Sequence, residues 1–239
     1  MSKKRLTILS IAIVAGIIII DQIIKVVVKT NMHLYEHIPV TDWFNIAFTE
    51  NKGMAFGMQL FKDTPLENIG KMGLTIFRIL AACFIIYYIR QQIRKGASTG
   101  YIVLLSMVLA GDIGNVIDCM FYGQIFSASY PEPAPLATFV PFGQGYDDFM
   151  MGRVVDMFYF PLVEWNMPYI PLLSWIPGFP AVGEHCVFFN AIFNFADASI
   201  SVSMVALILF YRKQIMAIGA QPNNKQQEEK TTQVQDNKE

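Results

Sequence analysis

The amino-acid sequence predicts an all-α membrane protein, with four transmembrane helices, a small β platform at the outer face and an enlarged outer loop. Of the 239 residues, 54% are hydrophobic and only 15% are charged, and the mean hydropathy is +0.39. Soluble domains carry about 25% charged residues. A helix needs about 20 apolar residues to cross a hydrocarbon core. Four stretches meet this length, at approximately 6–28, 72–90, 100–122 and 189–211.

The composition excludes two other classes of protein. Three cysteines, Cys83, Cys119 and Cys186, are too few to staple a secreted domain. The 18 basic residues are balanced by 19 acidic residues, so no basic face for nucleic acid is expected. A disulfide between Cys119 and Cys186 is conceivable because both lie near outer helix ends, but we expect the two thiols to be free.

The first apolar stretch is predicted to be a retained transmembrane helix. Lys3, Lys4 and Arg5 precede it, as basic residues precede the apolar part of a signal peptide. The apolar run, however, continues through "LTILSIAIVAGIIII" to "IIKVVV". It is too long for a cleavable signal sequence and has no small-residue cleavage site.

Basic residues predict the orientation of the four helices. Loops rich in Lys and Arg stay on the cytoplasmic side of a membrane. We therefore expect both termini and the loop 91–99 to be cytoplasmic, and the segments 30–71 and 123–188 to be outside. The basic residues that flank the helices, with no acid among them, are Lys3, Lys4, Arg5, Arg90, Arg94, Lys95, Arg212 and Lys213.

The two outer segments differ in composition. Segment 30–71 has aromatic and apolar residues around a turn-like Asn51-Lys52-Gly53, which predicts the small sheet. Segment 123–188 is rich in proline and contains Trp165 and Trp175, so we expect it to lie on the membrane surface and cap the helices. Residues 1–212 then form one membrane domain, and the polar residues 213–239 form a disordered cytoplasmic tail.

Polar residues from separate segments are predicted to meet at one depth near the outer face. An ionisable group inside an apolar helix costs about 2.5–3.5 kcal/mol, so it usually has a partner or a function. The residues concerned are Asp21 and Lys25 on the first helix, Asp112, Asn115 and Asp118 on the third, Asn194 and Asp197 on the fourth, and Asp156 in the outer loop.

Several of these residues also have a purely structural interpretation. Asp21 and Lys25, four residues apart, could form only an interfacial ion pair. Asn115 and Asn194 could join helices by hydrogen bonds. Asp112 is best explained as a group that satisfies nearby backbone.

A carboxylate inside the fourth helix, Asp197, is harder to explain by structure alone. His33, His37 and His185 lack metal-ligand spacing, so neither a metal nor a cofactor is expected. Two close carboxylates cannot both ionise easily, so one keeps a proton while the other is ionised. The ionised carboxylate can then take a proton from water, and the protonated one can polarise a carbonyl. This chemistry is aspartic peptide hydrolysis. A small proton-coupled membrane transporter is the alternative, although the internal repeats and broken helices typical of transporters are absent from the sequence.

Five short strings, in the same order, resemble the lipoprotein signal peptidases (signal peptidase II). Members of that family are four-helix membrane aspartic proteases, and the strings cover most of residues 6–212. They are "DQIIK" at 21–25, "ENKGMAFG" at 50–57, "GNVID" at 114–118, "VVDMF" at 154–158 and "FNFADASI" at 193–200.

The resemblance implies a hydrolase of the bacterial cytoplasmic (inner) membrane, with its active site near the outer face. Its partners would be the lipid bilayer and diacylglyceryl-modified prolipoproteins, which it would cut immediately before the lipid-modified cysteine. The resemblance assigns catalysis to Asp156 and Asp197. It assigns substrate binding or support of this pair to Asn51, Gly53, Asn115, Asn194, Asp21, Lys25 and Asp118.

The sequence departs from the family pattern in two ways. Cys119 stands where many members have an arginine after "GNxxD", and Arg153 is a candidate replacement. Residues 123–152 and 159–189 also lengthen links that are commonly short. We expect this enlarged loop to lie on the membrane and to gate access to the site.

Overall fold

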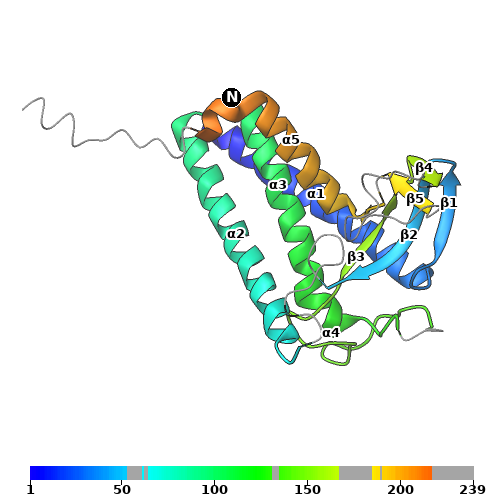
Figure 1. Ribbon diagram of the computed structural model, residues 1–239. Helices are drawn as coiled ribbons and strands as arrows, with labels where there is room; N and C mark the ends of the chain where they lie inside the picture. Colours follow the sequence, from blue (N-terminus) through cyan, green and yellow to red (C-terminus); the bar gives the residue numbers. More distant parts are fainter. Residues whose placement is uncertain (53–60, 62–63, 131–134, 167–184, 189, 217–239) are drawn as a thin grey trace, which may run out of the picture.

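A computed structural model describes residues 1–52, 61, 64–130, 135–166, 185–188 and 190–216 of the chain. Within these residues, four helices are long and apolar enough to cross a membrane, which confirms the four predicted spans (Figure 1). The helices are α1 (Lys3–Asn31), α2 (Glu67–Lys95), α3 (Thr99–Ile117) and α5 (Phe195–Met216). A π-helical turn, η2 (Asp118–Tyr122), and the short α4 (Gly123–Ile125) continue α3.

Local sequence explains where these helices begin. The Ser2 hydroxyl accepts a hydrogen bond from the Arg5 N–H at the start of α1, and Ser98 caps α3 in the same way through the Tyr101 N–H. The fourth helix begins at Phe195 rather than near 189, because a short strand precedes it. It continues to Met216, so residues 213–216 of the expected tail are helical, and residues 217–239 lie outside the described part of the chain.

The predicted β platform is present, but both segments between helices contribute to it. Its antiparallel strands follow the order β1-β2-β3-β6, and a separate two-stranded sheet pairs β4 with β5. In the part of the chain that the structure describes, the strands are β1 (His37–Thr41), β2 (Phe44–Asn51), β3 (Val154–Tyr159), β4 (Val163–Asn166), β5 (His185–Phe188) and β6 (Ile192–Phe193).

The first hairpin turns before the turn-like Asn51-Lys52-Gly53 is reached. The chain reverses between Thr41 and Phe44, whereas Asn51 is still in β2 and pairs with Val154 of β3. The strand extends this far because β3 provides a partner for it, and β3 comes from a remote part of the chain. Gly53, and Trp175 of the second segment, lie outside the described residues.

The strand register places Asp156 on a particular face of the sheet. Phe48, Val155 and Met157 are fully buried and belong to a core that includes Val28 of α1. Because side chains alternate along a strand, Asp156 points to the opposite face from Val155 and Met157. The strand therefore packs one face on α1 and presents its carboxylate on the other.

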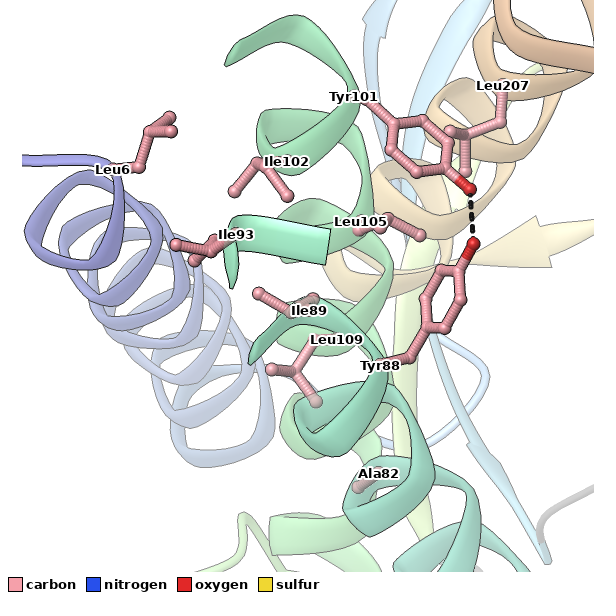
Figure 2. Close-up of a cluster of buried hydrophobic side chains, with 10 residues drawn as sticks. All are labelled: Leu6, Ala82, Tyr88, Ile89, Ile93, Tyr101, Ile102, Leu105, Leu109 and Leu207. Atoms are coloured by element: carbon pink, nitrogen blue, oxygen red, sulfur yellow. Dashed lines mark hydrogen bonds between the residues drawn. The ribbon is translucent and has the colours of Figure 1, made fainter. Parts of the chain in front are cut away.

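A second core holds the four long helices together at the end remote from the sheet. Leu6, Ile89, Tyr101 and Leu207 come from α1, α2, α3 and α5 and are all buried (Figure 2). The Tyr101 hydroxyl is 2.8 Å from that of Tyr88. The other end, where α1 ends and α2 begins, carries the strands and is called the sheet end below (Figure 1).

The described residues of 123–152 are fastened to the end of α3. The Tyr146 N–H donates to the Phe126 carbonyl at 3.0 Å, and the Asp147 N–H donates to the Gly123 carbonyl at 3.0 Å. A Cβ on Gly145 would lie 2.0 Å from the Gly123 oxygen, so this close approach requires glycine. This part of the predicted enlarged loop is therefore packed structure.

Candidate active site

Asp156 and Asp197 converge on one asparagine, Asn194. Asp156 lies in β3 and is buried, whereas Asp197 lies in the first turn of α5 and is half-buried. The Asn194 side-chain amide donates to Asp156 Oδ1 at 2.7 Å, and the Asn194 backbone N–H donates to Asp197 Oδ2 at 3.3 Å. The structure thus brings together two acids that are 41 positions apart in the sequence.

The local sequence "NFAD" determines the orientation of Asp197. Asn194 immediately precedes α5, and its Oδ1 accepts a hydrogen bond of 2.8 Å from the Asp197 N–H. With the return bond to Asp197 Oδ2, this pair forms a reciprocal capping box. The Asp197 carboxylate therefore lies at a helix N-terminus, where backbone N–H groups and the helix dipole stabilise negative charge.

Asn115 of α3 links the two acids to the centre of the bundle. Its amide donates to Asp197 Oδ1 at 2.8 Å. Its Oδ1 accepts from the Asn194 amide at 3.1 Å and from Lys25 Nζ at 2.9 Å. Both predicted asparagines therefore contact the acids directly, and each oxygen of Asp197 accepts a hydrogen bond.

Lys25 is fully buried among three acceptors. Its Nζ is 2.8 Å from Asp21 Oδ2, 2.8 Å from Asp118 Oδ2 and 2.9 Å from Asn115 Oδ1. An ammonium group has three donors, so its hydrogen bonding is complete. The predicted pair of Asp21 and Lys25 is thus part of a larger ion cluster that includes Asp118.

Asp21 and Asp118 of this cluster each accept a backbone hydrogen bond from an element that carries a candidate catalytic aspartate. Asp21 Oδ1 accepts from the Ala196 N–H at 2.9 Å, in the first turn of α5. Asp118 Oδ2 accepts from the Val155 N–H at 3.3 Å, next to Asp156 in β3. The ion cluster therefore sets the position of strand β3 relative to helix α5.

Gln22 belongs to this network, and the sequence reasoning missed it. Its amide donates to Asp118 Oδ1 at 2.9 Å and to the Gly114 carbonyl at 3.2 Å, and its Oε1 accepts from the Tyr122 hydroxyl at 3.1 Å. A polar residue inside an apolar helix was the available signal. Gly114 matters as well, because a Cβ there would lie 2.9 Å from Asp21 Oδ2.

The electrostatics of the two acids are unequal. Burial, and then the nearby charge of Asp197, raise the pKa of Asp156 to about 8. Asp156 is therefore mostly protonated at neutral pH, while each oxygen of Asp197 accepts a hydrogen bond. The pair can hold one proton between them and offer an acid and a base on neighbouring elements.

The Arg153 side chain contacts Tyr130 and Glu50. Its guanidinium stacks on the Tyr130 ring at 3.8 Å, and its Nη1 is 3.8 Å from Glu50 Oε2. Glu50 also contacts the fully buried Lys29, which donates to Ser129 at 3.1 Å. This cluster, also missed in the sequence, ties the segment 123–152 to α1 and β2.

The guanidinium that does reach Cys119 belongs to Arg78 of α2. Its Nη1 donates to Cys119 Sγ at 3.6 Å. Cys119 is buried and its thiol is free, so the conceivable bridge to Cys186 is not formed. Among the other predicted residues, Asn51 ends β2 opposite Val154, two residues before Asp156, and Gly53 lies outside the described residues.

Comparison with known proteins agrees with this architecture. The family model described as signal peptidase (SPase) II matches residues 13–212. A lipoprotein signal peptidase of Porphyromonas gingivalis is 42% identical over 205 residues, which cover 85% of this chain and 83% of the relative. One of Amoebophilus asiaticus is 32% identical over 219 residues, which cover 90% and 81%.

A solved structure shows a similar fold. A bacterial membrane enzyme determined by the in meso method at 2.3 Å resolution superposes with a TM-score of 0.50 at 20% sequence identity. The match covers 86% of this chain and 88% of the other.

Proposed function

Because this chain belongs to the signal peptidase II family, and therefore removes signal peptides from prolipoproteins, we propose that it does so as an aspartic endopeptidase with Asp156 and Asp197 as its catalytic pair. The observation that carries the proposal is the contact of Asn194 with both carboxylates. Nothing in the comparisons supports a proton-coupled transporter.

The raised pKa of Asp156 assigns the two roles. Asp197 is the general base that takes a proton from a water molecule, whose oxygen then attacks the scissile carbonyl carbon. Asp156, protonated because its pKa is about 8, donates its proton to the carbonyl oxygen. The product of this step is a neutral tetrahedral diol.

Collapse of the diol completes the reaction. The C–N bond breaks as Asp197 returns its proton to the leaving nitrogen, and Asp156 recovers a proton from the diol hydroxyl that becomes the new carbonyl. Both side chains finish in their starting states. The roles need a fixed geometry, which Asn115 and Asn194 supply through their hydrogen bonds to the acids.

Supporting residues act through position. Asp21, Lys25 and Asp118 hold β3 against α5, so they maintain the separation of the catalytic pair. Asn51 is proposed to contact the substrate, because it lies beside the start of β3. Gly53 is proposed to act with it on the basis of the family resemblance.

The proposed membrane placement follows from the distribution of charge. Residues 1–212 form a multi-pass domain of the bacterial cytoplasmic (inner) membrane, with both termini cytoplasmic and the sheet end near the outer face. The flanking basic residues support this orientation, because they gather at the end remote from the sheet (Figure 1). The proposed substrates are diacylglyceryl-modified prolipoproteins, cut immediately before the lipid-modified cysteine.

Cleavage of a diacylglyceryl prolipoprotein by the purified full-length protein tests the catalytic pair. Asp156→Asn and Asp197→Asn should each reduce turnover by at least about 100-fold, the contribution of a general acid or base. Asp42→Asn is the matched control, because Asp42 is exposed in the turn of the β1–β2 hairpin. Parental cleavage by the Asp197→Asn protein would refute the assignment.

A further inference from the structure

A row of aromatic rings starts beside the candidate catalytic pair. Phe158 follows Asp156 by two residues in β3, so its side chain lies on the same face of the sheet. Its ring centroid is 6.1 Å from that of Phe193, which pairs with it from β6. Phe193 immediately precedes Asn194, the residue that bonds to both acids. The row therefore begins at the candidate active site itself.

The row continues without a break to the turn of the first hairpin. The Phe160 ring stacks on the Phe193 ring at 5.6 Å. It also stacks on the Phe44 ring at 4.8 Å and on the Trp43 ring at 6.0 Å. Trp43 lies in the turn between β1 and β2, and this hairpin lies on the side of the bundle away from α2 (Figure 1). We call Trp43, Phe44, Phe158, Phe160 and Phe193 the aromatic row.

The surface of the aromatic row is accessible and apolar. Phe158 and Phe160 are half-buried, whereas Trp43 is 56% exposed. Phe158 pairs with Ile46 across the sheet, and Ile46 pairs with Ile38, so both isoleucines widen the apolar surface on the same face. Phe158 and Ile46 also border the core beneath the sheet, which fixes the surface in place. Exposed apolar surface of this kind marks a site of contact with a ligand or a lipid.

One part of the proposed substrate fits such a surface. The diacylglyceryl group is attached to the cysteine that follows the scissile bond, so its acyl chains start close to the catalytic pair. A polypeptide segment needs partners for its polar backbone groups, and phenylalanine rings offer none. An acyl chain is apolar along its whole length. Phe160 lies about 13 Å from Asp156 along the strand, at about 3.3 Å per residue, and a long acyl chain spans that distance.

We propose that the aromatic row is a subsite for one acyl chain of the diacylglyceryl group on the substrate. The chain lies along the rings from Phe158 toward Trp43, while the scissile peptide bond lies at the two aspartates. Burial of the chain against the rings removes apolar surface from water, which favours binding. The subsite therefore selects lipid-modified prolipoproteins over unmodified ones. The inference rests on the proposed function, and it adds the surface that recognises the lipid.

The test compares kcat/KM of the full-length protein on two prolipoprotein peptides, whose cysteine carries either dipalmitoylglyceryl or dibutyrylglyceryl. The parent should prefer the dipalmitoyl peptide by at least about 10-fold, because several more methylene groups enter an apolar site. Phe160→Ala should lose about this factor on the dipalmitoyl peptide and stay within about twofold of the parent on the dibutyryl peptide. The loss should appear mainly in KM, since the chain makes the same contacts before and during the reaction.

A second variant and a control keep the test independent of folding. Trp43 is exposed in a turn, so Trp43→Ala should fold normally and still lose kcat/KM selectively on the dipalmitoyl peptide. Phe210 is the matched control, because it is 76% exposed near the end of α5 remote from the sheet, and Phe210→Ala should change neither value. Equal losses on both peptides in the Phe160 and Trp43 variants would show that the row only supports the fold. Parental values on both peptides would show that the acyl chain lies elsewhere.

Failure of this inference is distinct from failure of the proposed catalytic pair. Equal cleavage of the two peptides by the parent, with Asp156→Asn and Asp197→Asn inactive, would overturn the acyl-chain subsite alone. Parental activity in either aspartate variant would overturn the catalytic pair instead, whatever the aromatic row binds.

Discussion

Asn194 and Asp197 bond to each other twice, since each side chain accepts a hydrogen bond from the other's backbone N–H at the start of α5. The same Asn194 amide donates to Asp156 at 2.7 Å. The residue that begins the helix thus also joins the two acids. Helix formation and the geometry of the candidate active site therefore depend on one side chain.

Substitution of Asn194 separates these two roles. Asn194→Ser should keep the helix cap, because serine is a good N-cap residue, but it removes the amide donor to Asp156. Asn194→Ala removes both and should also lower the free energy of unfolding by about 1 kcal/mol. We expect both variants to lose most of their cleavage activity, and Asn194→Ala to lose more thermal stability in detergent than Asn194→Ser, because it also loses the cap. An active Asn194→Ser protein would show that the contact with Asp156 is dispensable.

The pKa of Asp156 predicts the alkaline limb of the pH profile. Burial and Asp197 raise this pKa to about 8, and the proposed mechanism needs Asp156 protonated. The kcat/KM should therefore fall as the pH rises through about 8. A profile that stays flat up to about pH 9.5, more than one unit above this pKa, would contradict the role of Asp156 as the acid.

The same shift predicts how stability depends on pH. An unfolded aspartate has a pKa near 3.9, so the folded protein binds an extra proton at Asp156 between about pH 4 and 8. The stabilisation that this raised pKa gives is complete below the unfolded value and is lost as the pH rises through the folded value. Asp156→Asn should remove this loss, so its melting temperature should gain on the parent between pH 5 and 8. An equal pH dependence in both proteins would contradict the shift.

Lys25 is predicted to contribute to folding more than any exposed lysine. Lys25→Met leaves Asp21 and Asp118 buried together without their cation, which should lower the free energy of unfolding by about 3–5 kcal/mol. Lys52→Met is the matched control, because Lys52 pairs with Glu67 at a partly exposed site and should cost no more than about 1 kcal/mol. Similar losses in the two variants, measured by thermal unfolding in detergent, would argue against the buried ion cluster.

The packed segment 123–152 offers a test of whether the enlarged loop controls access. Gly145→Ala places a Cβ 2.0 Å from the Gly123 oxygen and should displace the segment, whereas a Cβ on Gly16 in α1 has no neighbour within 4 Å. Gly145→Ala should change turnover or the preference among several prolipoproteins, and Gly16→Ala should not. Identical kinetics in both variants, with a lowered melting temperature for Gly145→Ala, would make the segment only structural.

Much of the site was predictable because its residues carry local signals. Asp21 and Lys25 are polar, lie inside an apolar helix and are spaced to share a face, and the structure confirms their contact. The capping box is contained in "NFAD", and the convergence of Asn115, Asp156 and Asp197 followed from residue depth together with the family resemblance. Their catalytic and supporting roles stay predictions.

Other contacts had no local signal. Lys25 meets Asp118, and Arg78 meets Cys119, only because the helices have a particular rotation and register. The contacts of Arg153, offered as a candidate replacement for the missing arginine, had no local signal either, since they depend on which face of β3 the side chain occupies. The pairing of β2 with β3 as far as Asn51 had no local signal either, because β3 comes from a remote part of the chain.

The sequence by itself determined the four spans and predicted their orientation and the polar residues at one depth. It could do so because hydropathy and helical periodicity are properties of neighbouring residues. The tertiary structure alone decided which charges pair, how the sheet combines two segments, and that Asn194 lies between the two aspartates. Pairing across the bundle can join residues that are far apart in the sequence, such as Lys25 and Asn115, which are 90 positions apart. Such pairs depend on the packing of whole helices, and no short stretch of sequence encodes that packing.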